Sequence, residues 1–359
     1  MGWRLSQSIK RMVAAALTLS IPIGAYGQET ASTLNSAAAE ARKAGIAEYR
    51  LGHFSEADLL LRRALEYAEQ DHDVFSAALN RVALGDIYQA QRQFRKAEQT
   101  YVEGISVFRQ MQRIHALAIT LRNLASVLTA QGKYKESIRH LEEASMLAKT
   151  ITPVDFELEL RILETFGVTC FKQGKIDKAL EFFKRSIERA KAPRSGMSDV
   201  NLGQMLNNLA SVYEYKRQYR LAEDTYLDAL RVTEEQFGRT HRQFVGTMHN
   251  LGYLYMTTRR YQDAEVQFRQ SLAIAERSGL GLDDIVIRSL HGLGKIHMKR
   301  DEDAQAEATL SRALGIARGS GINGPEAAEV LETYSQLLLN EARRIRASLA
   351  LTIHIDNAR

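Results

Sequence analysis

One arrangement of small and large side chains recurs seven times along this 359-residue chain, at steps of 40 to 43 residues. Each unit has a small residue at a reference position and another small residue twelve positions upstream. Both lie in segments with apolar side chains every three or four residues, the pattern of an amphipathic helix. Each unit therefore predicts two short helices that approach closely at their small residues. The reference residues are Ala57, Ala97, Ser137, Ala179, Ala222, Ala264 and Ala306, and the upstream residues are Gly45, Gly85, Ala125, Gly167, Ala210, Gly252 and Gly294.

At two further positions, the units carry residues of the same type. The residue seven places after the reference is again small, and the residue three places before it is aromatic or apolar in six of the seven units. The exception is Asp303 of the seventh unit, where Asp301-Glu302-Asp303 replaces the usual turn. A helix pair this short cannot bury its apolar stripes alone, so each pair needs a copy on either side. We therefore expect an all-α, elongated solenoid in one domain.

The repeated pattern resembles the tetratricopeptide repeat, whose small and aromatic positions fall at these offsets. The steps exceed the 34 residues typical of that repeat because both helices are longer. Three units carry an asparagine before Leu-Ala or Leu-Gly, which makes the repeats similar to those of kinesin light chains. The resemblance implies a right-handed superhelix of about seven helix pairs, over residues 37–322, with a concave groove for a partner. It is carried by segments such as Leu251-Gly252-Tyr253-Leu254-Tyr255 with Tyr261, Ala264 and Phe268.

The pattern degenerates in residues 323–359. Pro325 opens a further helix, and we expect a degenerate eighth repeat in the form of a capping helix pair, whose second helix runs from Ala342 to Leu351. A terminal unit with a polar outer face is what the end of a solenoid requires. The last residues of the chain form a tail with no assigned role.

Residues 1–27 have the features of a secretory signal peptide. A basic head is followed by a short apolar core, and small residues precede Gln28. We expect cleavage after Gly27, a flexible lead-in over 28–36, and a periplasmic or secreted protein. An uncleaved N-terminal anchor is the alternative. Cleavage would lower the formal net charge from +5 to +2, which favours no nucleic-acid partner.

Motifs of catalysis and cofactor binding are missing from the sequence. There is no glycine-rich phosphate loop and no His-Glu-x-x-His run, and Cys170 is the only cysteine. His249 and His291 occupy equivalent positions in successive units. We expect them on an exposed face, with a shared metal as the less favoured alternative. We accordingly expect no enzyme activity, no cofactor and no metal.

The predicted site is a peptide-binding groove lined by the first helix of each unit. Asparagine is a poor helix former, so its recurrence at Asn123, Asn208 and Asn250 needs a reason. In repeats of the type that this chain resembles, such residues hold the backbone of an extended peptide. The alternative is that each asparagine ties its helix to the next repeat. The full set of predicted groove residues is Asn123, Asn207, Asn208, Ser211, His249, Asn250, Tyr253, Met256 and His291.

These expectations favour a non-catalytic scaffold that binds an extended segment or helix of a partner protein. A narrower form of the hypothesis is an assembly factor of the cell envelope or of secretion. The alternative is a peptide-sensing regulatory protein. The partner and the oligomeric state do not follow from the sequence.

Overall fold

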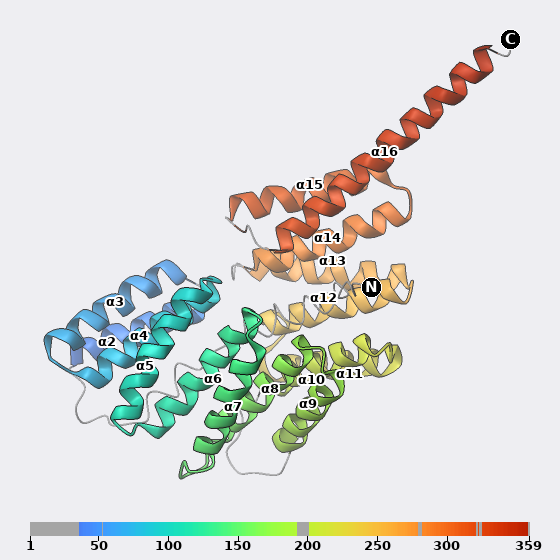
Figure 1. The fold of residues 1–359 in the computed structure, drawn as a ribbon. Helices are drawn as coiled ribbons and strands as arrows, with labels where there is room; N and C mark the ends of the chain where they lie inside the picture. Colours follow the sequence, from blue (N-terminus) through green and yellow to red (C-terminus); the bar gives the residue numbers. More distant parts are fainter. Residues whose placement is uncertain are drawn as a thin grey trace. The chain divides into compact units, whose positions relative to one another are not determined.

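The computed structural model describes residues 36–51, 53–191, 201–278, 282–320, 322 and 325–357, with side chains described up to Arg346. Those ranges contain fifteen α-helices and no strand, so the all-α prediction is confirmed there (Figure 1). No helix within them is both long and apolar enough to cross a bilayer. The helices are α2 (Ser36–Leu51), α3 (Phe54–Gln70), α4 (Val74–Ala90), α5 (Phe94–Gln110), α6 (Ile114–Ala130), α7 (Tyr134–Ala148), α8 (Phe156–Lys172), α9 (Ile176–Lys191), α10 (Leu202–Tyr215), α11 (Tyr219–Phe237), α12 (Arg242–Thr257), α13 (Tyr261–Ser278), α14 (Asp283–Lys299), α15 (Asp303–Gly319) and α16 (Pro325–Asn357).

The start of every second helix coincides with one column of the sequence alignment. Helices α3, α5, α7, α9, α11, α13 and α15 all begin three residues before their reference position. This includes α15, which begins at Asp303 although the residue is not aromatic. The turn before the second helix has a residue with positive φ five places before the reference position in six units. A left-handed residue at that place ends the first helix and reverses the chain. The six residues are Arg92, Gly132, Gly174, Arg217, Arg259 and Asp301.

The close approach expected at the small residues is present. All seven reference residues are 0% exposed. At five of the upstream glycines, an added Cβ would lie between 2.6 and 2.9 Å from the large side chain sixteen positions later. Only a hydrogen fits in that space, so the glycines are required by packing rather than by backbone conformation. The five pairs are Gly45 with Leu61, Gly85 with Tyr101, Gly167 with Phe183, Gly252 with Phe268, and Gly294 with Leu310.

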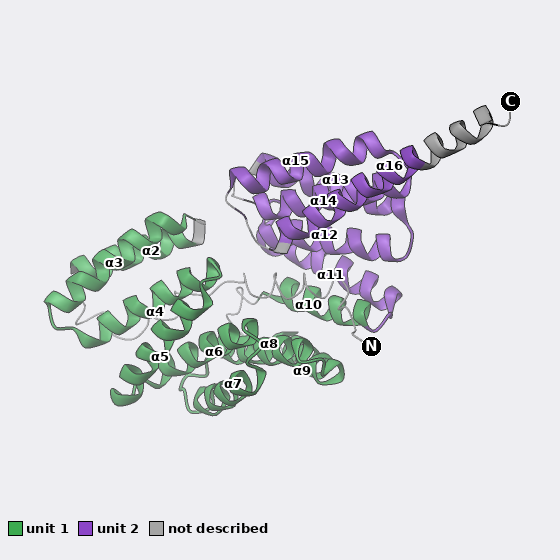
Figure 2. Cartoon of the chain, turned by 45° about the horizontal axis from the view of Figure 1, so that its top comes forward, with its two compact units in different colours: residues 1–215 green, residues 216–359 purple. Residues whose placement is uncertain are grey.

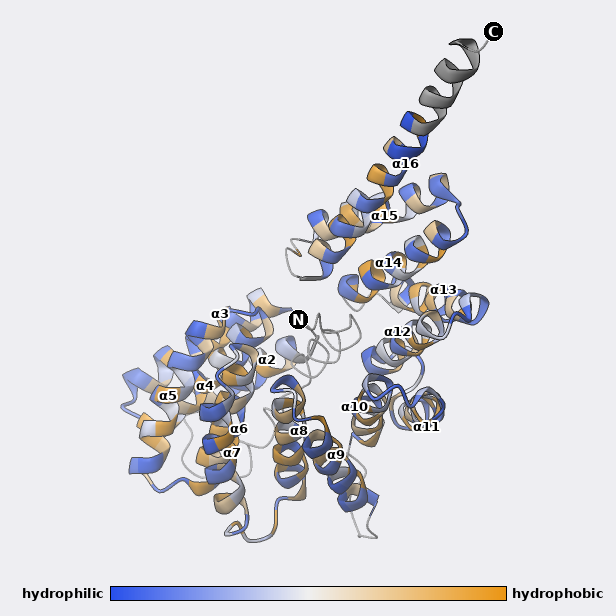
Figure 3. Ribbon diagram, turned by 45° about the vertical axis from the view of Figure 1, so that its right-hand side comes forward, coloured by the Kyte–Doolittle hydropathy of each residue, from blue (hydrophilic) through white to orange (hydrophobic). Residues whose placement is uncertain are grey.

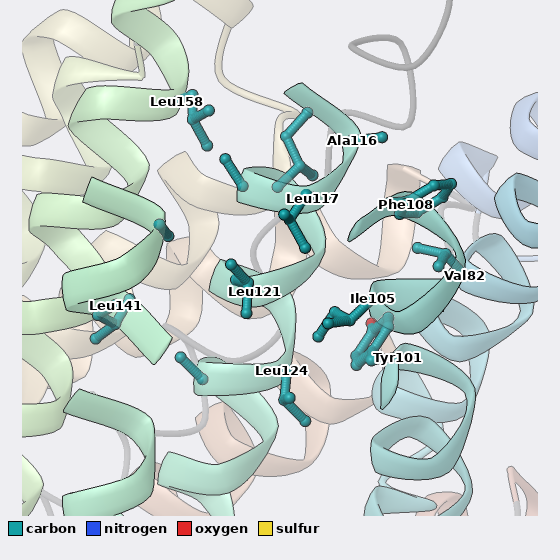
Figure 4. Close-up of a cluster of buried hydrophobic side chains, with 14 of the residues drawn as sticks. Val82, Tyr101, Ile105, Phe108, Ala116, Leu117, Leu121, Leu124, Leu141 and Leu158 are labelled. Atoms are coloured by element: carbon teal, nitrogen blue, oxygen red, sulfur yellow. The ribbon is translucent and has the colours of Figure 1, made fainter. Parts of the chain in front are cut away.

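The chain divides into two compact units, residues 1–215 and 216–359 (Figure 2). In the first unit, apolar side chains of α4 to α8 form one continuous core, with Tyr101, Ile105 and Leu121 near its centre (Figure 4). In the second unit, helices α12 to α16 share a core that includes Ile287, Leu310 and Val330. Each core runs across several repeats, which is how stacked helix pairs bury stripes that one pair cannot cover.

First helices contact one another as well as the second helices between them. These contacts join α4 to α6 and α6 to α8 in the first unit, and α12 to α14 and α14 to α16 in the second. The first helices therefore form the inner side of each stack. A surface built from their side chains runs across several repeats.

The C-terminal region differs from the prediction of a capping helix pair. Residues Pro325–Asn357 form the single helix α16, and its start at Pro325 agrees with the expected effect of the proline. No glycine or proline interrupts residues 326–357, so nothing in the sequence ends the helix near Ala342. The signal peptide 1–27 and residues 28–35 of the predicted lead-in lie outside the described residues.

Candidate binding surface on the first helices

Buried polar side chains are distributed unequally between the two helices of a repeat. Among the described residues, the second helices bury four, all of them hydroxyl residues: Ser137, Ser186, Thr233 and Ser271. The first helices bury charged, amide and imidazole groups as well. These larger groups are Arg42, Asn80, Asp86, Gln89, Arg122, Asn123, Gln204, Asn207, Asn208, Glu214, Gln243, His249, Asn250, His291 and His297. Hydrophobic burial accounts for the packing of the second helices. It does not account for the larger polar groups that the first helices bury.

In the first unit, a buried network is centred on Asp86 of α4. The hydroxyl of Tyr101 donates to Asp86 Oδ1 at 2.6 Å and lies 3.0 Å from Oε1 of Gln89. Nδ2 of Asn123, on the first helix of the next repeat, donates to the same Asp86 oxygen at 3.1 Å. Nε2 of Gln89 donates to the hydroxyl of Ser126 at 3.3 Å. The network thus ties α4 to α5 and to α6.

Burial dominates the electrostatics of this network. It raises the pKa of Asp86 from 3.8 to about 7, although the hydrogen bonds from Tyr101 and Asn123 and the nearby Arg122 act in the opposite direction. Burial likewise raises the pKa of Glu164, on α8, from 4.5 to about 7. Two carboxyl groups of the inner side therefore change their charge near neutral pH.

Three oxygens of these side chains are buried without a hydrogen-bond partner. They are Oδ2 of Asp86, Oδ1 of Asn123 and Oε1 of Glu164. Leaving such a group unsatisfied costs on the order of 1–3 kcal/mol, so native proteins keep few of them. All three lie on first helices of the same unit, and the two carboxyl oxygens are acceptors in the ionised form, which predominates above about pH 7. They are suited to N–H donors.

The predicted asparagines have different surroundings. Asn123 is fully buried and bonds Asp86 of the preceding repeat, as the alternative of a tie between repeats requires. Oδ1 of Asn208 accepts from Nε2 of Gln204 at 2.9 Å within α10. Asn250, on α12, is 7% exposed. The hydrogen bond of Asn123 favours the tie at that repeat, and the role of all three asparagines in holding a peptide stays a prediction.

The other predicted groove residues fall in both units. Asn207 and Ser211 lie with Asn208 on α10 of the first unit and are buried. Asn250, Tyr253 and Met256 lie on α12 of the second unit, where Met256 is half-buried. Each unit therefore carries its own part of the predicted surface.

His249 and His291 are buried, at 0% and 2% exposure, so their predicted place on an exposed face is wrong. The ring of His249 packs 4.8 Å from that of Tyr253 and 5.5 Å from that of Phe268. Nδ1 of His291 lies 3.4 Å from the hydroxyl of Tyr253, and its Nε2 lies 2.7 Å from Oγ1 of Thr333. Aromatic neighbours on α12 and α13 and the later helix α16 cover both imidazoles, which the helical period alone could not reveal. Across the described part of the chain, no three His, Cys, Asp or Glu side chains lie together as a metal site would require.

Asp86 and Glu164 are not among the groove residues predicted from the sequence. The sequence feature that could have identified Asp86 is the composition of the segment around it. Asp86 is the only charged residue between Val82 and Ala90, a buried stretch of α4. An acid in such a stretch is either paired or functional.

Long helix pairs with mutually contacting first helices define an α-solenoid with a polar inner side. Residues 115–192 and 201–278 match the family model of the tetratricopeptide repeat. These two segments of the chain are therefore tetratricopeptide repeats.

Three solved structures show how widely this fold is shared. BtubC (BKLC) from P. vanneervenii is 21% identical, with a TM-score of 0.56, and the match covers 65% of this chain and 94% of that one. A Rap protein complexed with competence and sporulation factor is 14% identical, with a TM-score of 0.59 and coverage of 88% and 86%. The apo form of the quorum sensor NprR from B. thuringiensis is 11% identical, with a TM-score of 0.56 and coverage of 92% and 97%. At these identities the likeness concerns the fold.

Proposed function

We propose that this protein is a non-catalytic scaffold whose first helices bind an extended segment or a helix of a partner protein. The observation that carries the proposal is the concentration of buried polar groups on the first helices, where oxygens such as Oδ2 of Asp86, Oδ1 of Asn123 and Oε1 of Glu164 have no hydrogen-bond partner. The second helices, whose buried polar residues other than tyrosine are serines and one threonine, provide the internal comparison. A fold that needed the first helices for packing alone would gain stability from apolar residues at these places.

The chemistry of the inner side fits a polypeptide. An extended segment presents N–H and C=O groups along its length, and side-chain amides supply both complementary functions. The free oxygens of Asp86, Asn123 and Glu164 can accept from backbone N–H groups or from Lys and Arg side chains of the partner. Hydrogen bonds from the partner would offset the free-energy cost of keeping these oxygens buried.

The fold comparison supports binding of another molecule. The similar Rap protein was solved in complex with competence and sporulation factor. We carry over from it only that a stack of this kind can hold a second molecule.

The place of action is part of the proposal. The basic head and apolar core of residues 1–27 support export to the periplasm or the medium. There the scaffold would serve assembly of the envelope or of secretion machinery.

Peptide selection tests the proposal on the full mature chain. A peptide would be selected from a displayed random library and its Kd measured by fluorescence anisotropy. Replacing Asn208 and Asn250 together with alanine should weaken binding by about 1–3 kcal/mol, since peptide amides would lose their partners. The matched control replaces Gln99 and Glu103, which bond each other at 3.0 Å on the exposed side of α5.

The control variant should bind as the wild type does. Unchanged binding by the double asparagine variant, with helical content preserved, would remove these residues from the site. Failure to select any peptide in repeated rounds would count against the scaffold as a whole.

A peptide-sensing regulator is the second candidate, favoured by the similar fold of the quorum sensor NprR. Affinity purification separates the two candidates. A scaffold retains a folded partner protein, whereas a sensor retains a short free peptide.

A further inference from the structure

Helix α16 differs from all other described helices in its length. It has 33 residues, whereas α2 to α15 have between 14 and 19. It continues past the end of α15, on which its first half packs (Figure 1). Part of α16 therefore has no helix of its own unit beside it.

The orientation of α16 is fixed by contacts on one face. Val330 and Leu337 are buried in the core of the second unit. The hydroxyl of Tyr334 donates to Oε1 of Glu307 at 3.2 Å. The guanidinium of Arg344 pairs with Asp301 at 2.8 Å and also with Asp303. The acidic turn that departs from the repeat pattern is thus the anchor of α16.

An exposed apolar stripe lies beside this packed face, roughly a quarter turn around the helix. Leu331, Leu338 and Ile345 follow each other at intervals of seven and are 51%, 42% and 62% exposed. Ala328, Ser335 and Ala342 alternate with them at spacings of three and four, and all three are exposed. Alternating bands of apolar and polar residues along α16 are visible in Figure 3. A seven-residue repeat of this kind is the seam along which two helices coil.

The charges of α16 indicate what covers this stripe. Residues 325–342 contain four glutamates and no lysine or arginine, whereas three arginines follow at Arg343, Arg344 and Arg346. Two parallel copies of the helix would place like charges side by side. Two antiparallel copies would place the acidic half of each against the basic half of the other.

We propose that two copies of this protein associate through antiparallel pairing of their α16 helices along Leu331, Leu338 and Ile345. In that arrangement, Leu338 lies near the twofold axis. Glu332 and Arg346 each follow a residue of the stripe by one position, so both lie on the same side of it. Glu332 then faces the partner's Arg346, and symmetry repeats the pair. The seam is short, so the dimer is weak and depends on concentration.

Sedimentation of the full mature chain over a concentration series tests the proposal. The wild type should shift from monomer to dimer, and Leu338→Glu should remain monomeric with unchanged helical content. Val266→Glu, at an exposed apolar residue of α13, is the matched control and should dimerise as the wild type does. A wild type that stays monomeric throughout, or a Leu338→Glu variant that dimerises normally, overturns the proposal.

Charge exchange tests the direction of pairing. Glu332→Arg and Arg346→Glu should each weaken self-association, and a mixture of the two variants should form heterodimers. The double variant should associate as the wild type does, a recovery that a folding defect would not produce. Self-association that is indifferent to all these charge changes contradicts the antiparallel pair.

Discussion

Replacement of Gly252 by alanine should destabilise the protein, whereas the same replacement at Gly246 should stabilise it. Both glycines lie on α12, six residues apart. A Cβ at Gly252 would lie 2.8 Å from Cε1 and 3.0 Å from Cδ1 of the Phe268 ring. A Cβ at Gly246 would meet nothing within 4 Å. The two substitutions have the same chemistry and differ in the space that they enter.

The magnitudes follow from two opposing effects. Alanine is favoured over glycine in a helix interior by about 1 kcal/mol, and this is the whole effect expected at Gly246. At Gly252 the ring of Phe268 is fully buried and cannot move without displacing its neighbours. Overpacking of this kind costs about 1–3 kcal/mol. It should exceed the gain in helix propensity.

Urea denaturation followed by circular dichroism measures both changes. The midpoint should fall for Gly252→Ala and rise for Gly246→Ala. Phe268→Leu should cost less in the Gly252→Ala background than in the wild type, because the smaller side chain makes room for the new methyl group. The chain already contains such a pair, since Ala125 and Leu141 occupy these two positions in the third repeat. Equal stabilisation by both alanines would refute the idea that the helix pairs meet at the small residues.

Three further predictions concern other parts of the chain. Folded Asp86 keeps its proton to about pH 7, while the unfolded chain releases it near 3.8, so this group lowers the free energy of unfolding as pH rises between these values. Asp86→Asn, which still accepts from Tyr101 and Asn123, should be more stable than the wild type at pH 8 by up to about 4 kcal/mol; equal stability at that pH would contradict the burial argument. Arg217 has φ of 59°, so Arg217→Gly should raise the free energy of unfolding in urea by up to about 1 kcal/mol, while Arg217→Ala, which keeps a Cβ, should not. Trp3 is the only tryptophan, so a processed protein should lack indole fluorescence, and its presence in the exported protein would mean that the signal segment is retained.

The repeats could be predicted because their packing rule is local. Each glycine of a first helix meets a large residue sixteen positions later, and each second helix begins at a fixed distance from its small residue. Both features leave a periodic trace in the sequence. The period also identifies the first helices as one class, which is why the predicted groove residues all lie on them.

How deeply individual side chains are buried could not be predicted in the same way. The helical period gives the direction in which His249 and His291 point, and it does not show that Phe268 and Thr333 cover them. The ion pair that anchors α16 joins Arg344 to Asp301, more than forty positions away. Neither residue belongs to the repeat pattern. The continuity of α16 was predictable in principle, from the absence of any helix breaker.

Site-specific photocrosslinking tests the central claim most directly. A photoreactive amino acid would replace Met256, half-buried on the first helix α12, or Val266, exposed on the second helix α13 of the same repeat. With a library-selected peptide bound, the probe at Met256 should crosslink to it, and the probe at Val266 should not. Crosslinking from Val266 with none from Met256, at the same peptide occupancy, would show that the partner binds elsewhere than on the first helices.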